Sequence, residues 1–187
     1  MCGIVGLLRP EPIDPATIQR AQESITHRGP DDAGVWMSPD RHVGFGHRRL
    51  SIVDLSAAGH QPFVSDGVVL VYNGEVYNFP EVRSELERLG HQFRSRTDTE
   101  VVLQAYRAWG AHCVRRLRGM FAFALWDVEA RRLVLARDRL GIKPLYWYED
   151  PRGVLAFASE LKALETLPDL DRKLDDTALW DFLTYLY

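Results

Sequence analysis

The chain has 187 residues, 46% of them hydrophobic, which is enough for one globular domain with a substantial core. Its 26 acidic and 23 basic residues give a formal net charge of -3 and are spread without long blocks, which argues against nucleic-acid binding. The sequence shows no signal peptide at its start and no apolar run long enough to span a bilayer. These features predict a cytoplasmic protein without membrane contact, whose partners are small molecules or other proteins.

The first residue that could carry chemistry is Cys2, in a predicted strand over residues 2–8. Removal of Met1 would leave the thiol and a free α-amine on this one residue. An unperturbed α-amine has a pKa of about 7.7, so part of it is unprotonated at neutral pH and can accept the thiol proton. Judged by position alone, the favoured alternative is that Cys2 packs as a small hydrophobic residue.

A helix capped by Asp14 is predicted next, followed by a loop over residues 27–34 that is rich in Gly, Pro and Asp. A strand is predicted from residue 43, and its alternation fades within residues 43–54. The adjacent Arg48 and Arg49 point in opposite directions in an extended chain, so only one of them can enter a given pocket. Such a pair usually lies at a solvated edge.

The unbroken apolar run over residues 68–72 is typical of a strand buried on both faces. The Asn73-Gly74 pair is predicted to end this strand and to turn the chain into a helix that begins near Asn78. A turn from strand to helix can expose a side-chain amide and a backbone N–H together. Two such donors could hold a developing oxyanion.

A capping box is predicted at the start of the next helix, with Thr97 bonding the first turn and Glu100 reaching back. Asp98 would then lie at the helix N-terminus. From the local sequence, the favoured role of Asp98 is to complement the helix dipole.

The second half of the chain is predicted to be mainly β-structure. A hairpin joins residues 120–126 to residues 133–136, a strand over residues 154–158 follows, and a final helix begins after Asp175. The sequence therefore predicts an α+β fold with antiparallel sheets.

No metal site or disulfide framework is predicted. The six histidines show no paired ligand spacing. Cys2 and Cys113 are the two cysteines of the chain, and Cys113 is expected to be a buried small residue on a helix.

Several of these motifs occur together in one order: Cys2, residues 27–31, residues 49–54, Asn73-Gly74-Glu75, Asp98 and the loop over residues 137–146. In this order they resemble the glutaminase domain of class II glutamine amidotransferases, which are N-terminal nucleophile hydrolases. The resemblance is greatest to glutamine-hydrolysing asparagine synthetases. It implies a four-layer αββα sandwich of two antiparallel sheets. It also implies a glutaminase domain over residues 1–165, with residues 166–187 as a connecting segment and the start of a helix leading to a synthetase domain that this chain lacks.

The resemblance assigns a role to each matching residue. Cys2 becomes the nucleophile, and the Asn73 amide with the Gly74 N–H becomes the oxyanion hole. Arg49 would hold the α-carboxylate of glutamine and Asp98 its α-ammonium group. The other pocket residues implied by the resemblance are Leu50, Ser51, Ile52, Val53 and Glu75.

The implied reaction is hydrolysis of glutamine to glutamate and ammonia through a γ-glutamyl thioester on Cys2. No cofactor is implied for this domain. Ammonia would pass to a synthetase domain of the same polypeptide, which amidates aspartate with ATP and magnesium, and a homodimer is a compatible assembly.

Three alternatives remain open from the sequence. The domain could serve a related amidotransferase with another ammonia acceptor. It could be an inactive scaffold or docking relative, as a retained Met1 would suggest, because the Cys2 nitrogen would then lie in a peptide bond. It could also hydrolyse other amides, although Arg49 and Asp98 argue for an amino-acid substrate.

Overall fold

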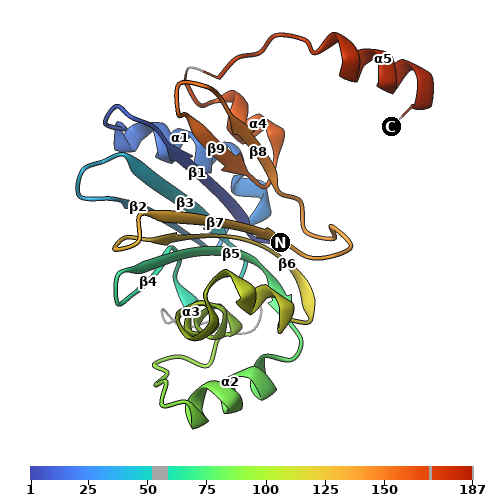
Figure 1. The fold of residues 1–187 in the computed structure, drawn as a ribbon. Helices are drawn as coiled ribbons and strands as arrows, with labels where there is room; N and C mark the ends of the chain where they lie inside the picture. The colour runs from blue at the N-terminus through green and yellow to red at the C-terminus, as the bar shows by residue number, and fades with distance from the viewer. Residues whose placement is uncertain (52–58, 169, 187) are drawn as a thin grey trace.

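Two antiparallel sheets lie face to face between helices in the computed structural model, which describes residues 1–51, 59–168 and 170–186 (Figure 1). The five-stranded sheet has the order β2-β3-β1-β9-β8 and the four-stranded sheet the order β4-β5-β6-β7. The strands of the first sheet are β1 (Gly3–Leu8), β2 (Asp32–Met37), β3 (Val43–Arg49), β8 (Tyr146–Glu149) and β9 (Leu155–Ala158). Those of the second are β4 (Phe63–Ser65), β5 (Val68–Val76), β6 (Gly119–Asp127) and β7 (Arg132–Arg137).

The helices form two outer layers. The α-helices are α1 (Pro15–Ser24), α2 (Phe79–Arg88), α3 (Asp98–Trp109), α4 (Leu161–Glu165) and α5 (Asp176–Tyr185), with 3-10 turns η1 (Thr26–Arg28) and η3 (Gly110–Arg115). In Figure 1, α1 and α4 cover the five-stranded sheet, while α2 and α3 cover the four-stranded sheet. This is the predicted α+β sandwich with four layers.

Three clusters of buried apolar side chains hold the layers together, as expected for sheets and helices that each bury one face. The cluster between the sheets includes Ile4, Phe45 and Phe157. A second cluster joins α1 and α4 to the five-stranded sheet, and a third joins α2 and α3 to the four-stranded sheet. The predicted burial of Cys113 is confirmed, because this residue is 1% exposed in the third cluster.

Local signals placed several elements correctly. The Asp14 side chain caps α1 by accepting from the Ala16 N–H at 3.0 Å, and Asp175 caps α5 in the same way. The predicted hairpin is confirmed by the antiparallel pairing of β6 with β7. The predicted loop over residues 27–34 is partly wrong, because residues 32–34 already belong to β2 and pair with β3.

The predicted turn at Asn73-Gly74 is wrong. Strand β5 continues to Val76, and Asn73 and Gly74 lie opposite Ala122 and Phe121 of β6 in an unbroken ladder. The reason is long-range pairing, since β6 offers partners along the whole length of β5. The helix near Asn78 is confirmed, and it begins at Phe79.

The predicted capping box is half right. The Thr97 hydroxyl accepts from the Glu100 N–H at 3.3 Å, but the Glu100 carboxylate does not return to Thr97. It accepts instead from the Arg94 N–H at 2.9 Å and the Ser95 N–H at 2.6 Å. Glu100 is 1% exposed and therefore ties the loop before α3 to that helix.

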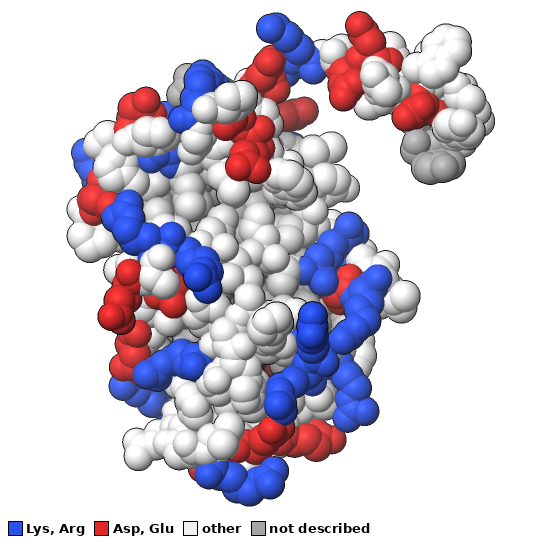
Figure 2. Space-filling model, in the orientation of Figure 1, with Lys and Arg blue, Asp and Glu red and all other residues white. Residues whose placement is uncertain are grey.

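The molecular surface mixes both signs of charge. Figure 2 shows acidic and basic side chains interspersed, with uncharged surface across the middle of the face in view. Helix α5 stands away from the sandwich in Figure 1, and each of its described side chains is exposed. In the part of the chain that the structure describes, no helix is long and apolar enough to cross a bilayer.

Candidate active site

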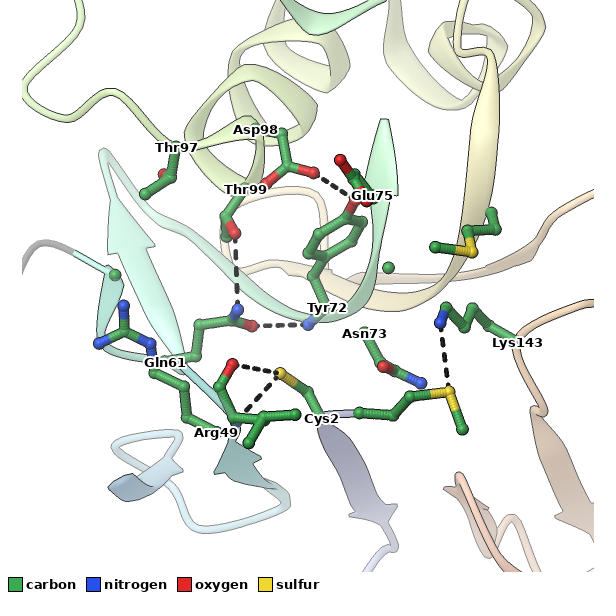
Figure 3. Close-up of a pocket in the computed structure, with 15 residues that line it drawn as sticks. Cys2, Arg49, Gln61, Tyr72, Asn73, Glu75, Thr97, Asp98, Thr99 and Lys143 are labelled. Carbon is green, nitrogen blue, oxygen red and sulfur yellow. Dashed lines mark hydrogen bonds between the residues drawn. The ribbon is translucent and has the colours of Figure 1, made fainter. Parts of the chain in front are cut away.

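A pocket of about 140 Å³ opens where the starts of β1 and α3 meet the ends of β3 and β5. Its size suits one small molecule. Figure 3 shows side chains from both sheets and from α3 converging on it. The pocket is lined by Met1, Cys2, Arg49, Leu50, Gly59, Gln61, Tyr72, Asn73, Gly74, Glu75, Thr97, Asp98, Thr99, Met120 and Lys143.

Cys2 lies at the floor of this pocket, one residue before β1. The Leu50 N–H donates to Cys2 Sγ at 3.4 Å, and Sγ lies 3.8 Å from the Leu50 carbonyl oxygen. Arg28 Nε donates to the Cys2 carbonyl oxygen at 2.9 Å, and Arg28 is itself held by Glu160 at 2.9 Å. One hydrogen bond therefore holds the Cys2 carbonyl, and another reaches the Cys2 sulfur from the chain after β3.

Glu160 is the anchor of this arrangement. Burial acts to raise its pKa, but hydrogen bonds from Arg28, His27 and Lys162 outweigh it and lower the pKa to about 2. Glu160 therefore stays ionised at neutral pH and keeps Arg28 against Cys2.

Asn73 points into the pocket beside Cys2 (Figure 3). It is 1% exposed, and its Nδ2 donor has no hydrogen-bond partner among the described residues. A buried polar group without a partner is costly and rare, so this amide is a candidate ligand donor. It can donate to an oxygen that becomes negative during attack by Cys2.

The Gly74 N–H faces the same side of β5 as two neighbouring N–H groups. Alternate N–H groups of a strand point the same way, and those of Tyr72 and Val76 donate to Gln61 and Asp98, away from β6. A side chain at position 74 would not fit, because a Cβ there would lie 2.4 Å from the Met120 carbonyl oxygen. Glycine thus lets β5 and β6 stay paired while the N–H turns to the pocket.

Arg49 lines the pocket from the end of β3 and is 8% exposed. Its neighbour Arg48 donates through Nε to the Gly29 carbonyl oxygen at 2.9 Å, so the prediction that the pair points in opposite directions is confirmed. The solvated-edge interpretation is wrong for Arg49. A Cβ at Gly59 would lie 2.0 Å from Arg49 Nη2, so Gly59 leaves the space that the guanidinium fills.

Asp98 is turned back toward β5 rather than serving only its own helix. Its Oδ2 accepts from the Tyr72 hydroxyl at 2.6 Å and from the Val76 N–H at 3.0 Å. Burial raises the pKa of Asp98, although both hydrogen bonds oppose the shift. Burial and Asp98 together raise the pKa of Tyr72, which therefore remains a donor. A cation entering the pocket would stabilise the Asp98 carboxylate.

His47 joins the two sheets behind the pocket. Its Nε2 donates to the Tyr72 carbonyl oxygen at 3.1 Å, which fixes the tautomer because a carbonyl oxygen can only accept. The ring is fully buried, and burial lowers the pKa of His47 to about 3. Nδ1 has no partner among the described residues. His47 is thus a neutral side chain that links β3 to β5 through this hydrogen bond.

The other predicted pocket residues divide into three groups. Leu50 and Glu75 line the pocket as expected. Ser51 does not line it: its N–H donates to Asp31 Oδ2 at 2.7 Å, which anchors the chain after β3. Ile52 and Val53 lie outside the described residues.

Sequence reasoning missed several pocket residues because they come from distant segments. Gln61 accepts from the Tyr72 N–H at 2.7 Å and donates to the Thr99 hydroxyl at 3.5 Å, although no local pattern marks it. Tyr72 was interpreted as a core residue of a strand. The missed residues that line the pocket are Gly59, Gln61, Tyr72, Thr97, Thr99, Met120 and Lys143.

Comparison with known proteins identifies the family. Residues 1–187 match the family model described as a glutamine amidotransferase domain. The chain belongs to this family. The match covers both sheets and every residue that lines the pocket.

Relatives in sequence include two proteins named as asparagine synthetases and one named as an amidase. This amidotransferase domain is 41% identical to Asparagine synthetase [glutamine-hydrolyzing] 3 of Bacillus subtilis, across 96% of the chain and 30% of the relative. It is 42% identical to a putative asparagine synthetase [glutamine-hydrolyzing] of Mycobacterium bovis, across 100% of the chain and 32% of the relative. It is also 42% identical to Amidase chry2 of Gibberella zeae, across 78% of the chain and 22% of the relative. The chain spans about a third or less of these relatives.

Solved structures share the fold at lower identity. The glutamine phosphoribosylpyrophosphate amidotransferase of Bacillus subtilis aligns with a TM-score of 0.74 at 21% identity, covering 88% of this chain and 43% of that chain. A structure titled as the allosteric regulatory enzyme of purine biosynthesis aligns with a TM-score of 0.76 at 20% identity, with the same coverage. These likenesses support the N-terminal nucleophile hydrolase fold.

Proposed function

We propose that this amidotransferase domain hydrolyses glutamine to glutamate and ammonia and is the glutaminase half of an asparagine synthetase. The observation that carries the glutaminase proposal is the buried Asn73 amide, which has no partner among the described residues and lies beside the Cys2 thiol. The asparagine product is supported by the names of the relatives.

The chemistry begins with loss of Met1. The exposed Cys2 amine takes the thiol proton, and the thiolate attacks the side-chain amide carbon of glutamine. The Asn73 amide and the Gly74 N–H hold the resulting oxyanion. The amine returns its proton to the leaving nitrogen, ammonia departs, and the γ-glutamyl thioester on Cys2 is then hydrolysed by water.

Substrate selection depends on two opposite charges at fixed positions. Arg49 binds the α-carboxylate through its planar fork, and Asp98 binds the α-ammonium group. With the amino-acid end held there, the reach to Cys2 sets the side-chain length. Asparagine is one methylene shorter than glutamine, so its amide falls short of the sulfur.

The remaining assignments concern the rest of the protein. We assign residues 1–165 to the glutaminase domain and residues 166–187 to the connection toward a synthetase domain. That domain would use ATP and magnesium to activate aspartate and would receive the ammonia within the same polypeptide. A cytoplasmic location, with its reducing conditions, suits a free thiol nucleophile. Sedimentation of the full-length protein tests the homodimer.

The decisive experiment measures glutamate release by the purified, Met-free chain, with intact mass recorded to confirm processing. The Cys2→Ala variant is the matched control, and asparagine is the matched substrate. Glutamate from the wild type, none from Cys2→Ala and little aspartate from asparagine are the expected results. A folded, Met-free wild type that releases no glutamate would contradict a stand-alone glutaminase and favour an inactive scaffold or docking role.

A second candidate is a glutaminase domain that feeds another acceptor. The similarity to Amidase chry2 favours it, because a relative of equal identity carries a different name. Supplying the full-length protein with glutamine, ATP, magnesium and aspartate separates the two. Asparagine formation supports the first candidate, and glutaminase activity without asparagine supports the second.

A further inference from the structure

Lys143 is a buried cation at the Cys2 end of the pocket. Its side chain is 6% exposed, and in the part of the chain that the structure describes its Nζ has one hydrogen-bonding partner, Met1 Sδ, at 3.2 Å. A thioether sulfur is a weak acceptor, whereas an ammonium group carries three donors. Burying a charge with so little compensation is costly, and such groups concentrate at functional sites.

The backbone around Lys143 is held rigidly by Asp138. This carboxylate accepts from the N–H groups of Phe121, Leu140, Ile142 and Lys143, at 2.9 to 3.2 Å. Burial acts to raise the pKa of Asp138, but these four bonds outweigh it and lower the pKa. Arg137 Nε adds a bond of 2.9 Å to the Lys143 carbonyl oxygen. The loop therefore presents Lys143 to the pocket in a fixed position.

Lys143 and Arg49 lie on opposite sides of Cys2 in Figure 3. Arg49 is assigned to the amino-acid end of glutamine, so Lys143 faces the end where the reaction begins. Lys143 also contacts the residue that is joined to the Cys2 nitrogen. When Met1 is cut away, the Cys2 nitrogen that was joined to this residue becomes the new amine, and the Met1 sulfur that Lys143 contacts is lost.

We propose that Lys143 is a positioning residue whose buried charge keeps the Cys2 amine in its unprotonated, basic form at neutral pH. The physical reason is repulsion between like charges in a poorly solvated site, which disfavours a second cation. The inference rests on the proposed glutaminase function, and it adds a residue that controls when the base is available.

Other charged groups face the same pocket and must be held constant in a test. The titratable and charged groups that surround the Cys2 amine are the Cys2 thiol, Arg28 with Glu160, Arg49, Tyr72, Glu75 and Asp98. Since Asp98 and Glu75 carry the opposite sign, they would favour the protonated amine. Variants at Lys143 leave all of these groups in place.

The first test is the pH profile of kcat/KM for glutamine hydrolysis by the processed chain. Lys143→Met and Lys143→Gln remove the charge, and Lys143→Arg keeps it. We expect the acid limb of the neutral variants to move upward by about one pH unit, with about tenfold lower activity at pH 6 and recovery above pH 9. Lys143→Arg should retain the wild-type limb. A uniform loss at every pH would indicate a merely structural role and would overturn the proposal.

The second test reads the amine without catalysis. In the Cys2→Ala background, the N-terminal amine is labelled with trace acetic anhydride across pH and quantified by peptide mass. Adding Lys143→Met should move the midpoint of labelling to higher pH, and adding Lys143→Arg should not. Unchanged midpoints in all three proteins would overturn the proposal.

The two proposals fail in different ways. An inactive wild type contradicts the glutaminase function, while amine labelling still decides the role of Lys143. An active wild type whose acid limb is the same in Lys143→Met and Lys143→Gln contradicts the role of Lys143 alone.

Discussion

The buried His47 predicts that the domain loses stability in mild acid. In the folded protein the pKa of His47 is lowered to about 3 from an ordinary value of 6.5. Below pH 6.5 His47 therefore binds a proton in the unfolded chain but stays unprotonated in the folded chain. The stability that depends on a neutral His47 is fully present above pH 6.5 and is lost progressively as the pH falls toward 3.

The magnitude follows from the difference between the two pKa values. Between pH 7 and pH 5, this difference lowers the free energy of unfolding by about 2 kcal/mol. For a chain of this size, that corresponds to a fall in the unfolding midpoint of about 4 to 8 °C. The pKa of Glu160 is lowered to about 2, so the stability that depends on its ionised form is lost below pH 4.5. Glu160 therefore changes the free energy of unfolding very little between pH 7 and pH 5.

Urea unfolding followed by tryptophan fluorescence at pH 7, 6 and 5 measures the effect. The matched variant is His47→Gln, which keeps an N–H donor for the Tyr72 carbonyl oxygen but cannot titrate. We expect the wild type to lose about 2 kcal/mol more than His47→Gln between pH 7 and pH 5. The comparison cancels other groups, including Asp98, whose raised pKa acts in the opposite direction. Parallel pH dependence in the two proteins would refute the reasoning.

Three further substitutions test the site and its support. Asn73→Ala removes the oxyanion donor and should lower kcat by about 10² to 10³-fold with an unchanged urea midpoint; a loss below fivefold would exclude the role. Gly59→Ala pushes a Cβ against Arg49 Nη2, so the KM for glutamine should rise about tenfold while kcat changes less. An unchanged KM would mean that Arg49 does not bind the substrate. Glu100→Gln turns an amide donor toward either the Arg94 or the Ser95 N–H and should cost about 2 kcal/mol in urea unfolding, with kcat at 25 °C nearly unchanged.

Sequence reasoning succeeded where the signal is local or where several residues are read together. The Asp14 cap and the β6–β7 hairpin depend on neighbours along the chain, and both were predicted correctly. The family and the fold followed from motifs in one order, and the family match supports them. The roles of Cys2, Arg49 and Asp98 remain predictions.

Long-range contacts explain what local patterns could not predict. The Asn73-Gly74 pair has the local signature of a turn, but pairing with β6 overrides it. Glu100 has the spacing of a capping box, yet a buried cluster of donors before α3 takes its carboxylate. Lys143 enters the pocket from a loop that follows Cys2 by 141 positions, and no spacing rule connects them.

The N–H groups of β5 point alternately to its two sides, which lets this strand pair with β6 and also contribute donors to the site. On one side it is paired with β6 throughout, so the strand itself is held in place. On the other side, β4 pairs with β5 up to Leu70, and beyond that point the N–H groups are free to bond other groups. The Tyr72 and Val76 N–H groups donate to Gln61 and Asp98, and the Gly74 N–H between them points to the same side, where we propose that it meets the substrate. Because β4 is short, the N–H groups on this side of β5 beyond Leu70 are not used in the sheet and can bond other groups. The pairing with β6 holds β5 in place, so an N–H on this side needs no movement of the strand to meet a developing oxyanion.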